Sequence, residues 1–383
     1  MAHIAFISLA ESGHLNPTLP IAAELVACGH RVTFPADDAM AARIRATGAQ
    51  TIPYVPAPAE TIVIDSMDAA ARATLNMLKQ LEHALPQIEA GYAGDHPDLI
   101  VNDWLAWDGP MLAAKWHTPR IQSWSSFAAS EGYDFGKFIV DMFAGSSSKA
   151  EFDTLLTAIL ERHGIPSMEL HDFYKPADFN LVYQPKAFHV HNETFDDRYA
   201  FVGPTNLPEP QDYTPPGRPL VYAALGTIIS DPDFFHTCVQ AFAGQPYHVV
   251  LSVGRAIDPA VLGPLPDNIE AHQFVPQTSV LAHADAFVTH AGMNSTMEAL
   301  AAGVPMLALP YTPEQQTTAE RIAELGLGHT LTPTDATADQ LRTIVADLLD
   351  DTVTRQRHTA MQEEVRRAGG APAAVDAIEA RLP

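Results

Sequence analysis

The chain has few cysteines, and it has no long apolar run. Cys28 and Cys238 are the only cysteines among its 383 residues, so at most one disulfide could form. Both lie in apolar helical patterns, which predicts that they pack in cores, and neither stands at a metal-ligand spacing. No stretch is apolar over the roughly 20 residues that a membrane-spanning helix needs. The first residues also lack a basic segment, so we expect no signal peptide, no membrane association and a cytoplasmic protein.

Basic side chains are scarce as well. Lys and Arg together number 22 against 46 Asp and Glu, which gives a formal net charge of −24 at pH 7. A charge of this sign repels phosphate backbones, so we expect no nucleic-acid partner. Any phosphate group that the protein binds must be held by local groups against this field. Apolar residues make up 47% of the chain, which is enough for two packed cores.

Short apolar runs alternate with helical patterns along the chain. The first run, residues 3–9, is typical of a buried parallel strand. A turn at Gly13 and His14 follows, and then a helix that Asn16 is expected to cap with Pro17 in its first position. Further strands are predicted at residues 31–34, 99–101, 220–225, 249–253, 269–274, 286–289 and 306–309. This alternation predicts the α/β class with parallel, doubly wound sheets.

A proline-dense segment divides the chain near its middle. Residues 203–219 contain six prolines, a composition typical of a stiff linker. We therefore predict an N-terminal domain over residues 1–202 and a C-terminal domain over residues 220–383. The last stretch, residues 352–382, is helical in pattern and is assigned to the second domain as a tail.

A candidate anion site follows the strand at residues 286–289, although residues 286–320 contain no Lys or Arg. His290 ends the strand, Gly292 permits close approach of the backbone, and Asn294 or Ser295 is expected to open a helix. Ligands of open parallel sheets bind at the carboxyl ends of strands, and the free N–H groups of a helix start attract anions. A diphosphate here would be bound by these N–H groups, the polar side chains and the imidazole.

Three further polar residues suit sugar hydroxyls. Glu298 lies one turn into the same helix, where its carboxylate could accept hydrogen bonds from a ribose diol. Glu314 and Gln315 follow the next strand and would therefore reach the same edge of the sheet. For each residue alone, an ordinary helix cap or loop position is an adequate explanation. The joint pattern is not explained in that way, because a cap does not require the rest of it.

Residues 289–298, with residues 274–277 and the pair Glu314 and Gln315, resemble the donor signature of the UDP-dependent glycosyltransferase superfamily, above all its bacterial macrolide-type members. The resemblance implies the GT-B architecture, in which two Rossmann-like domains face a central cleft and the C-terminal helix packs back toward the N-terminal domain. It further implies that the N-terminal domain binds the acceptor and the C-terminal domain the nucleotide sugar.

Roles for single residues follow from the same resemblance. Phe274 would stack on the base, while Val275 and Gln277 would flank the base and the ribose. Glu298 would hold the ribose, and Glu314 and Gln315 the sugar, although relatives commonly have Asp in place of Glu314. The residues implied to contact the diphosphate are Thr227, His290, Gly292, Asn294 and Ser295.

Joining a sugar to a hydroxyl group requires a base that removes the hydroxyl proton, and histidine suits this task near neutral pH. His14 follows the first strand and matches the general base of the family. Its second ring nitrogen needs an acceptor, and Asp103, at the end of the strand that starts at residue 99, matches the family's partner. Asp108 is the local competitor, but it precedes a helical run, so helix capping explains it better.

The sequence thus predicts an inverting O-glycosyltransferase that needs neither a metal nor a cofactor. It would move a hexose, glucose from UDP-glucose, to a hydroxyl of a small apolar acceptor such as a macrolide, another polyketide antibiotic or a phenolic compound. A dTDP-deoxysugar donor is the alternative within the class. A GT-B-fold nucleotide-sugar epimerase and an inactive helper protein are rivals from other classes. Both a monomer and a homodimer remain open.

Two other patterns carry less weight. Asp231 and Asp233 flank Pro232 in a spacing that resembles a metal-binding motif, but the segment is expected to start a helix with Asp231 as its cap. Several aromatic residues of the N-terminal half could line an acceptor pocket, although core packing is the default for each: Trp104, Trp107, Trp124, Phe127, Tyr133, Phe135 and Phe138.

Overall fold

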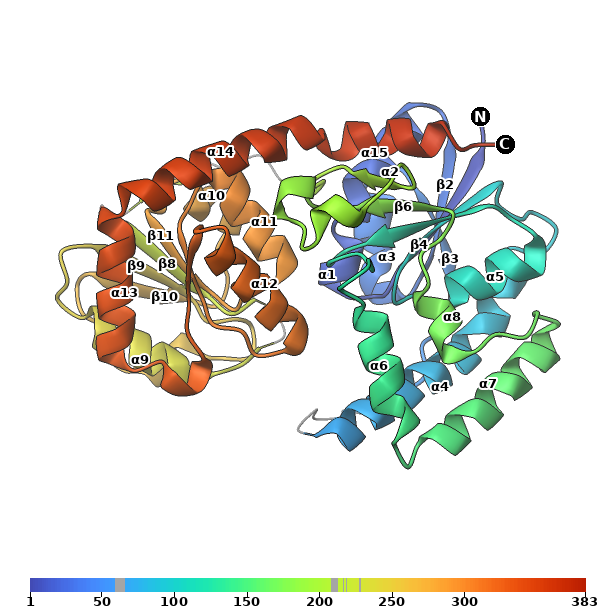
Figure 1. Ribbon diagram of the computed structural model, residues 1–383, viewed down its shortest axis with the longest axis horizontal. Helices are drawn as coiled ribbons and strands as arrows, with labels where there is room; N and C mark the ends of the chain where they lie inside the picture. The colour runs from blue at the N-terminus through green and yellow to red at the C-terminus, as the bar shows by residue number, and fades with distance from the viewer. Residues whose placement is uncertain (59–65, 208–212, 216, 218, 227–228) are drawn as a thin grey trace. The chain divides into compact units, whose positions relative to one another are not determined.

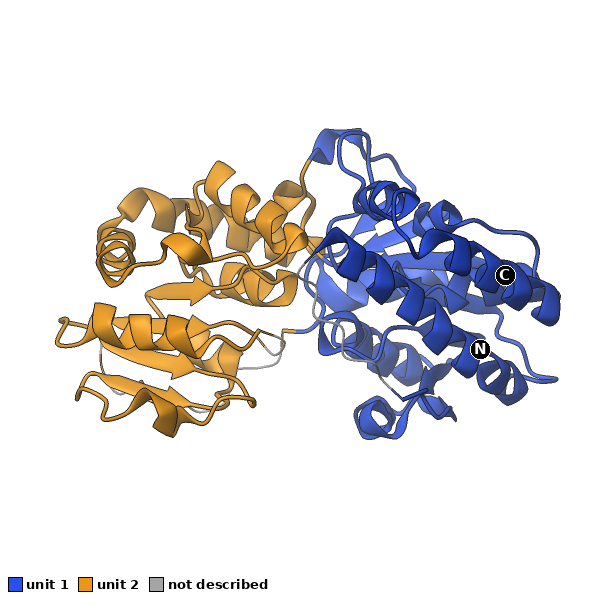
Figure 2. Ribbon diagram, turned by 90° about the horizontal axis from the view of Figure 1, so that it is seen from below, with its two compact units in different colours: residues 1–183, 191–206, 369–383 blue, residues 184–190, 207–368 orange. Residues whose placement is uncertain are grey.

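The computed structural model describes residues 1–58, 66–207, 213–215, 217, 219–226 and 229–383 (Figure 1). The chain forms two compact units (Figure 2). Unit 1 comprises residues 1–183, 191–206 and 369–383, and unit 2 comprises residues 184–190 and 207–368. The units differ from the predicted domain ranges at two places, because residues 184–190 belong to unit 2 and the end of the chain belongs to unit 1.

Unit 1 is built on a seven-stranded sheet with the order β3-β2-β1-β4-β5-β6-β7, and all its strand pairs are parallel. The strands are β1 (His3–Ile7), β2 (Arg31–Ala36), β3 (Gln50–Pro53), β4 (Leu99–Asp103), β5 (Arg120–Trp124), β6 (Phe179–Val182) and β7 (Tyr199–Phe201). The strand order reverses between β1 and β4. At such a switch point the connections leave in opposite directions, and a binding crevice forms outside the carboxyl ends of the two strands.

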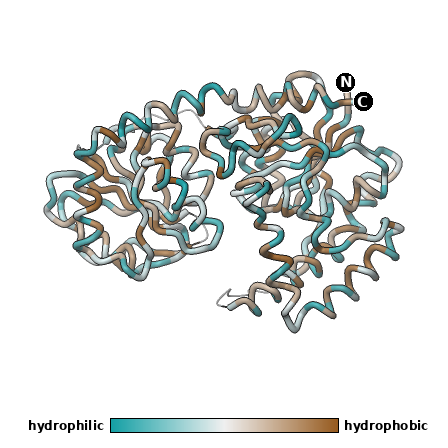
Figure 3. The backbone as a smooth tube through the Cα atoms, viewed as in Figure 1, coloured by the Kyte–Doolittle hydropathy of each residue, from teal (hydrophilic) through white to brown (hydrophobic). Residues whose placement is uncertain are grey.

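Helices cover both faces of this sheet: α1 (Ser12–Leu15), α2 (Thr18–Ala27), α3 (Asp38–Arg45), α4 (Met67–Gly91), α5 (Asp108–Trp116), α6 (Phe135–Ala144), α7 (Lys149–His163), α8 (Leu170–Tyr174) and α15 (Gly370–Glu379). Because successive strand residues point to opposite faces, β1 contributes Ile4 and Phe6 to one core and Ala5 and Ile7 to the other. Hydrophobic residues concentrate along the strands (Figure 3).

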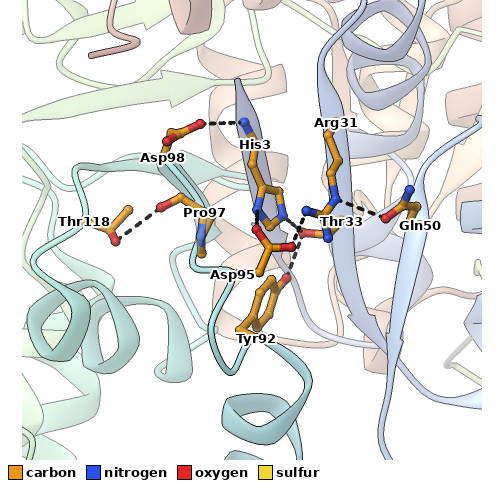
Figure 4. Close-up of polar contacts among 9 residues, drawn as sticks. All are labelled: His3, Arg31, Thr33, Gln50, Tyr92, Asp95, Pro97, Asp98 and Thr118. Carbon is orange, nitrogen blue, oxygen red and sulfur yellow. Dashed lines mark hydrogen bonds and ion pairs between the residues drawn. The ribbon is translucent and has the colours of Figure 1, made fainter. Parts of the chain in front are cut away.

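Buried polar side chains close the amino ends of β1 and β2 (Figure 4). His3 Nε2 lies 3.0 Å from Thr33 Oγ1, which lies 2.9 Å from the Tyr92 hydroxyl. The backbone N–H of His3 donates to Asp98 Oδ2 at 2.7 Å. Burial, followed by the charge of Arg31, lowers the pKa of His3, so the neutral imidazole is favoured. These polar groups lie at the opposite end of β1 from His14, and His3 Nδ1 lies 3.7 Å from Asp95 Oδ1 without a hydrogen bond.

Unit 2 contains a six-stranded sheet with the order β10-β9-β8-β11-β12-β13, again with parallel pairs. Its strands are β8 (Leu220–Ala224), β9 (His248–Ser252), β10 (Ile269–His272), β11 (Ala286–Thr289), β12 (Met306–Ala308) and β13 (Gly328–Thr330). Its helices are α9 (Pro232–Phe242), α10 (Gln277–Leu281), α11 (Met293–Ala302), α12 (Pro313–Glu324), α13 (Ala338–Asp350) and α14 (Thr352–Ala368). Here the strand order reverses between β8 and β11.

Two Rossmann-like sheets confirm the predicted α/β class, while some local predictions were wrong. Cys28 is exposed at the end of α2, whereas Cys238 is buried as expected. The strand predicted at residues 269–274 ends at His272, which leaves Phe274 in the following loop. The turn expected at His14 is the short helix α1, and the next helix begins at Thr18 with Pro17 as its N-cap. Among the described residues, no helix is both long enough and apolar enough to cross a lipid bilayer.

The last helix completes a core of unit 1. Ala374, Val375 and Ile378 of α15 are buried in the cluster that also contains Ile21 and Leu25 of α2. The prediction that the C-terminal helix returns to the N-terminal domain is thereby confirmed. The final residues add a cation–π contact, in which the Arg381 guanidinium lies 3.0 Å from the centroid of the Phe179 ring.

The packing of α15 leads to a stability prediction. Replacing Ile378 with Ala removes a fully buried side chain and is expected to lower the free energy of unfolding of unit 1 by about 2–4 kcal/mol. Urea unfolding measures the loss, and Asp376→Ala, on the exposed side of the same helix, is the matched control. Equal stability of the two variants would contradict a structural role for α15.

Candidate functional site

The carboxyl edge of the unit 1 sheet brings His14 and Asp103 together. His14 lies in α1, directly after β1, and Asp103 is the last residue of the neighbouring strand β4. His14 Nδ1 is 3.0 Å from Asp103 Oδ1. The Asp103 side chain is 1% exposed and that of His14 is 17% exposed. The pair predicted from the sequence is therefore formed, with a buried carboxylate behind an imidazole that reaches the surface.

Ser125 is a third member of this cluster, and the sequence analysis missed it. Its Oγ lies 3.0 Å from His14 Nδ1 and donates to Asp103 Oδ2 at 3.0 Å. Asp103 Oδ1 also accepts from the backbone N–H of Leu105 at 2.9 Å. Both oxygens of the buried carboxylate thus have donors, as a buried charge requires. Ser125 follows β5, so recognising that strand beside β4 would have placed it at this edge.

The contacts determine the tautomer of His14. A carboxylate can only accept hydrogen bonds, so Nδ1 carries the proton and the basic lone pair is on Nε2. Asp103 and Ser125 both face the same ring nitrogen, Nδ1. In a hydrolase triad the serine instead faces the nitrogen opposite the aspartate. The geometry therefore supports a histidine base and does not make Ser125 a nucleophile.

Asp108 has a different role from Asp103. It is the first residue of α5, where the backbone N–H groups of Asp108 and Gly109 hydrogen-bond its carboxyl group. Burial raises the pKa of Asp108 to about 6, and these hydrogen bonds oppose the rise. The N-cap of α5 is Trp107, and no side chain caps the helix, so the predicted capping role of Asp108 is wrong, although the residue does lie in the first turn of α5.

Neighbouring elements hold α1 in place. Arg43 of α3 donates to Ser12 Oγ at 3.4 Å and also to the side-chain oxygen of Asn16. Thr205 Oγ1 donates to the carbonyl oxygen of Pro17 at 2.6 Å. These contacts anchor both ends of the short helix, so the position of His14 does not depend on one helical turn alone.

The carboxyl edge of the unit 2 sheet carries the second cluster. Gly292 is the N-cap of α11, so the helix begins at Met293, earlier than the Asn294 or Ser295 start that was predicted. The cap has no side chain that could occupy the N–H groups of the first turn. Ala291, just before it, has a φ of 61°, in the left-handed region that costs free energy for any residue but glycine. Such strain is typical of functional turns.

His290 is enclosed by glycines at this turn. A Cβ on Gly292 would lie 2.3 Å from His290 Nε2, and one on Gly226 would lie 2.7 Å from its Cε1. Burial lowers the pKa of His290 to about 4, so its ring is neutral near pH 7. Gly292 is thus needed for the imidazole itself, and the edge has no positive charge from this residue.

A hydrogen-bonded network joins Gln277, Ser295 and Glu298. Gln277 Nε2 donates to Ser295 Oγ at 3.1 Å and to Glu298 Oε2 at 2.7 Å. The Tyr222 hydroxyl of β8 donates to Gln277 Oε1 at 3.0 Å. Burial raises the pKa of Glu298 to about 7, and the hydrogen bond from Gln277 opposes that rise. Tyr222 was missed because it lies within an apolar strand, where a tyrosine is indistinguishable from a core residue.

The other predicted donor residues are placed as follows. Phe274 is 72% exposed in the loop after β10, and Val275 beside it is buried. Glu314 and Gln315 lie in the first turn of α12, where Gln315 Oε1 accepts from the backbone N–H of Tyr311 at 2.8 Å. The hydrogen bonds of the described residues do not link them to the Gln277 network. Asn294 lies in the first turn of α11, and Thr227 falls outside the described residues.

Most of the aromatic residues singled out in the sequence, and Asp231, have structural roles. Trp104, Trp107, Trp124 and Phe127 are each at most 3% exposed and pack in the core, while Phe138 is 42% exposed. Asp231 caps α9 by accepting from the backbone N–H of Phe234 at 2.9 Å, and it accepts from the Tyr311 hydroxyl at 2.8 Å. The capping prediction for Asp231 is confirmed.

Burial of His290 implies that acid destabilises unit 2. Because its pKa is lowered from 6.5 to about 4, the neutral ring contributes stability that is complete above pH 6.5 and is lost as the pH falls toward 4. We therefore compare the unfolding free energy of the wild type with that of His290→Gln. The wild-type value minus the variant value is expected to decrease as the pH falls from 6.5 toward 4. Urea unfolding at a series of pH values measures the difference, and a constant difference from pH 7 to 4.5 would contradict the assignment.

Several known proteins are similar to this chain in sequence and in fold. A family described as erythromycin biosynthesis protein CIII-like, C-terminal domain, matches residues 246–379. The NDP-glycosyltransferase YjiC of Bacillus licheniformis is 38% identical and covers 99% of this chain and 98% of its own. The oleandomycin glycosyltransferase of Streptomyces antibioticus is 35% identical, with coverage of 100% and 91%. The crystal structure of a calicheamicin glycosyltransferase matches with a TM-score of 0.88 at 34% identity, covering 99% of this chain and 98% of that one.

The similarities to the two relatives and to the crystal structure extend over essentially the whole chain, and the fold of that structure agrees with the two parallel sheets. The relatives named are transferases, which matches the predicted class rather than the rival epimerase. The chain belongs to the bacterial macrolide-type glycosyltransferases of the UDP-glycosyltransferase superfamily, which have the GT-B fold, and it is a glycosyltransferase.

Proposed function

We propose that this glycosyltransferase transfers glucose from UDP-glucose to a hydroxyl group of a small apolar acceptor, such as a macrolide, another polyketide antibiotic or a phenolic compound. The observation that carries the proposal is the hydrogen bond of 3.0 Å between His14 and the buried carboxylate of Asp103. The nucleotide sugar is a co-substrate in this reaction, and no metal or cofactor takes part.

On the acceptor side, His14 acts as the general base. Asp103 accepts from Nδ1–H and so stabilises the positive charge that the ring gains when Nε2 takes up a proton. Nε2 removes the proton of the acceptor hydroxyl as its oxygen attacks C1 of the sugar. The bond from C1 to the diphosphate breaks on the opposite face, so the configuration at C1 inverts.

On the donor side, the diphosphate is held at the start of α11. The N–H groups of its first turn and the helix dipole stabilise the negative charge that develops on the leaving group. Neutral His290 adds no charge, and residues 286–320 contain no Lys or Arg. The exposed ring of Phe274 offers a surface for the base. Glu298 binds the ribose, and Glu314 with Gln315 binds the hexose.

The names of the relatives support a natural-product acceptor and leave a second donor open. One relative acts, by its name, on oleandomycin. A 38% identical protein of Streptomyces fradiae is named demethyllactenocin mycarosyltransferase, so its sugar is not glucose. That relative favours, as the second candidate, a dTDP-deoxysugar donor with the same base and the same inversion.

Transfer assays test this proposal. His14→Ala is expected to lower kcat by about 10²–10⁴-fold through loss of the general base, and Asp103→Asn is expected to lower it through loss of the charge that supports the base. UDP-glucose and dTDP-glucose are each incubated with a panel of macrolides, other polyketides and phenols, and products are detected as mass shifts. His171→Ala, an exposed histidine of the same unit, is the matched control.

Two outcomes would overturn the proposal. Undiminished turnover by His14→Ala would remove His14 as the base. Absence of a glycosylated product for every pair of donor and acceptor would overturn the substrate classes.

A further inference from the structure

We propose that Tyr222 is a positioning residue for the donor nucleotide: its hydroxyl orients the Gln277 amide, the amide orients the Glu298 carboxylate, and the carboxylate then selects a ribose over a 2′-deoxyribose. The proposal rests on the proposed function, and it goes further by assigning the choice between UDP and dTDP to a residue buried inside the sheet.

Tyr222 is held rigidly. It lies in the middle of β8, is 1% exposed, and stacks on Phe287 of the adjacent strand β11 with ring centroids 4.9 Å apart and planes at 9°. Its hydroxyl lies 3.0 Å from Gln277 Oε1 at the start of α10. Because the ring is fixed by the sheet, its hydroxyl is a fixed reference point for a side chain at the edge of the sheet.

The direction of each hydrogen bond is determined by chemistry. Burial raises the pKa of Tyr222, which keeps the phenol protonated, and a carbonyl oxygen can only accept. The tyrosine therefore donates to Gln277 Oε1, and the NH₂ end of the amide must point the other way. There it meets Ser295 Oγ at 3.1 Å and Glu298 Oε2 at 2.7 Å. With the amide reversed, its oxygen would face a carboxylate oxygen, and both groups would lack a donor.

The network positions the Glu298 carboxylate to accept hydrogen bonds from a ligand with two neighbouring hydroxyl groups. Among the described residues, its hydrogen-bond donor is Gln277, which reaches Oε2. A ribose supplies two neighbouring hydroxyl donors, the 2′-OH and the 3′-OH, whereas a 2′-deoxyribose supplies the 3′-OH alone. A site built to bind a hydroxyl rejects the ligand that lacks it, because its own polar group then stays unpaired. We therefore expect the dissociation constant of UDP to be lower than that of dTDP by a factor of about ten or more.

Removal of the hydroxyl should reduce this preference. In Tyr222→Phe the Gln277 oxygen loses its donor and the amide loses its attachment to the sheet, so Gln277 holds Glu298 less firmly in place for the diol. UDP, which uses both hydroxyl contacts, is expected to lose about tenfold in affinity, and dTDP, which uses one, a smaller factor. The ratio of the two dissociation constants is the readout that a general loss of stability would not shift.

Isothermal titration calorimetry of the full chain with UDP and with dTDP measures both constants without an acceptor. The variants are Tyr222→Phe, Gln277→Met and the two combined. Tyr247→Phe is the matched control, because it removes a buried phenol hydroxyl of unit 2 that has no hydrogen-bond partner among the described residues. Thermal melts confirm that each variant is folded.

The expected result is a preference for UDP in the wild type and in Tyr247→Phe, a reduced preference in Tyr222→Phe and in Gln277→Met, and no further reduction in the double variant. That non-additivity shows that Tyr222 acts through Gln277. A wild type that binds dTDP as tightly as UDP would overturn the inference and leave transfer through His14 standing. An unchanged ratio of the two dissociation constants in Tyr222→Phe, or additive losses in the double variant, would also overturn the inference. Binding of neither nucleotide would overturn the inference together with the donor half of the proposed function.

Discussion

A buried carboxylate has to be surrounded by hydrogen-bond donors, and in this protein that requirement organises both clusters. Asp103 is 1% exposed and receives donors from His14, Ser125 and the backbone of Leu105. These donors come from α1, from the loop after β4 and from the residue after β5. They meet because parallel strands bring their carboxyl ends to one edge of the sheet and because the strand order reverses there. The same rule in unit 2 brings Gln277 to Glu298.

The turn that carries the second cluster lacks cationic side chains, because residues 286–320 contain no Lys or Arg. The chain carries a formal net charge of −24, and its candidate phosphate-binding turn has a neutral His290 in place of a charged side chain. Backbone N–H groups and a helix dipole are fixed in direction and do not titrate. Their attraction for an anion therefore does not depend on pH. The glycines beside His290 make the arrangement possible, because a Cβ at either one would collide with the ring.

Much of the fold and of the site was predictable, and the misses have physical causes. Strands made of apolar runs, such as β1 and β11, were found from their composition. His14, Asp103 and Glu298 were found from their positions relative to predicted strands and helices together with the family resemblance. Strands β5 and β6 were missed because buried polar residues, among them Gln122 and Asn180, interrupt their apolar runs. Without β5, nothing in the sequence pointed to Ser125. The start of α11 was misplaced because a glycine cap gives no side-chain signal.

The sequence by itself determined the alternation of strands and helices and which polar residues follow strands, because both depend on neighbours in the chain. It also determined the scarcity of positive charge, which is a matter of composition. Tertiary structure alone decided which of those residues meet. Strand order put β5 beside β4 and β8 beside β11, and this pairing supplied Ser125 to Asp103 and Tyr222 to Gln277. Contacts between residues 22 and 55 positions apart depend on how strands pair across the sheet, which composition along the chain does not encode. Burial, which makes His290 neutral and raises the pKa of Glu298, likewise arises only when the sheet and its helices are packed.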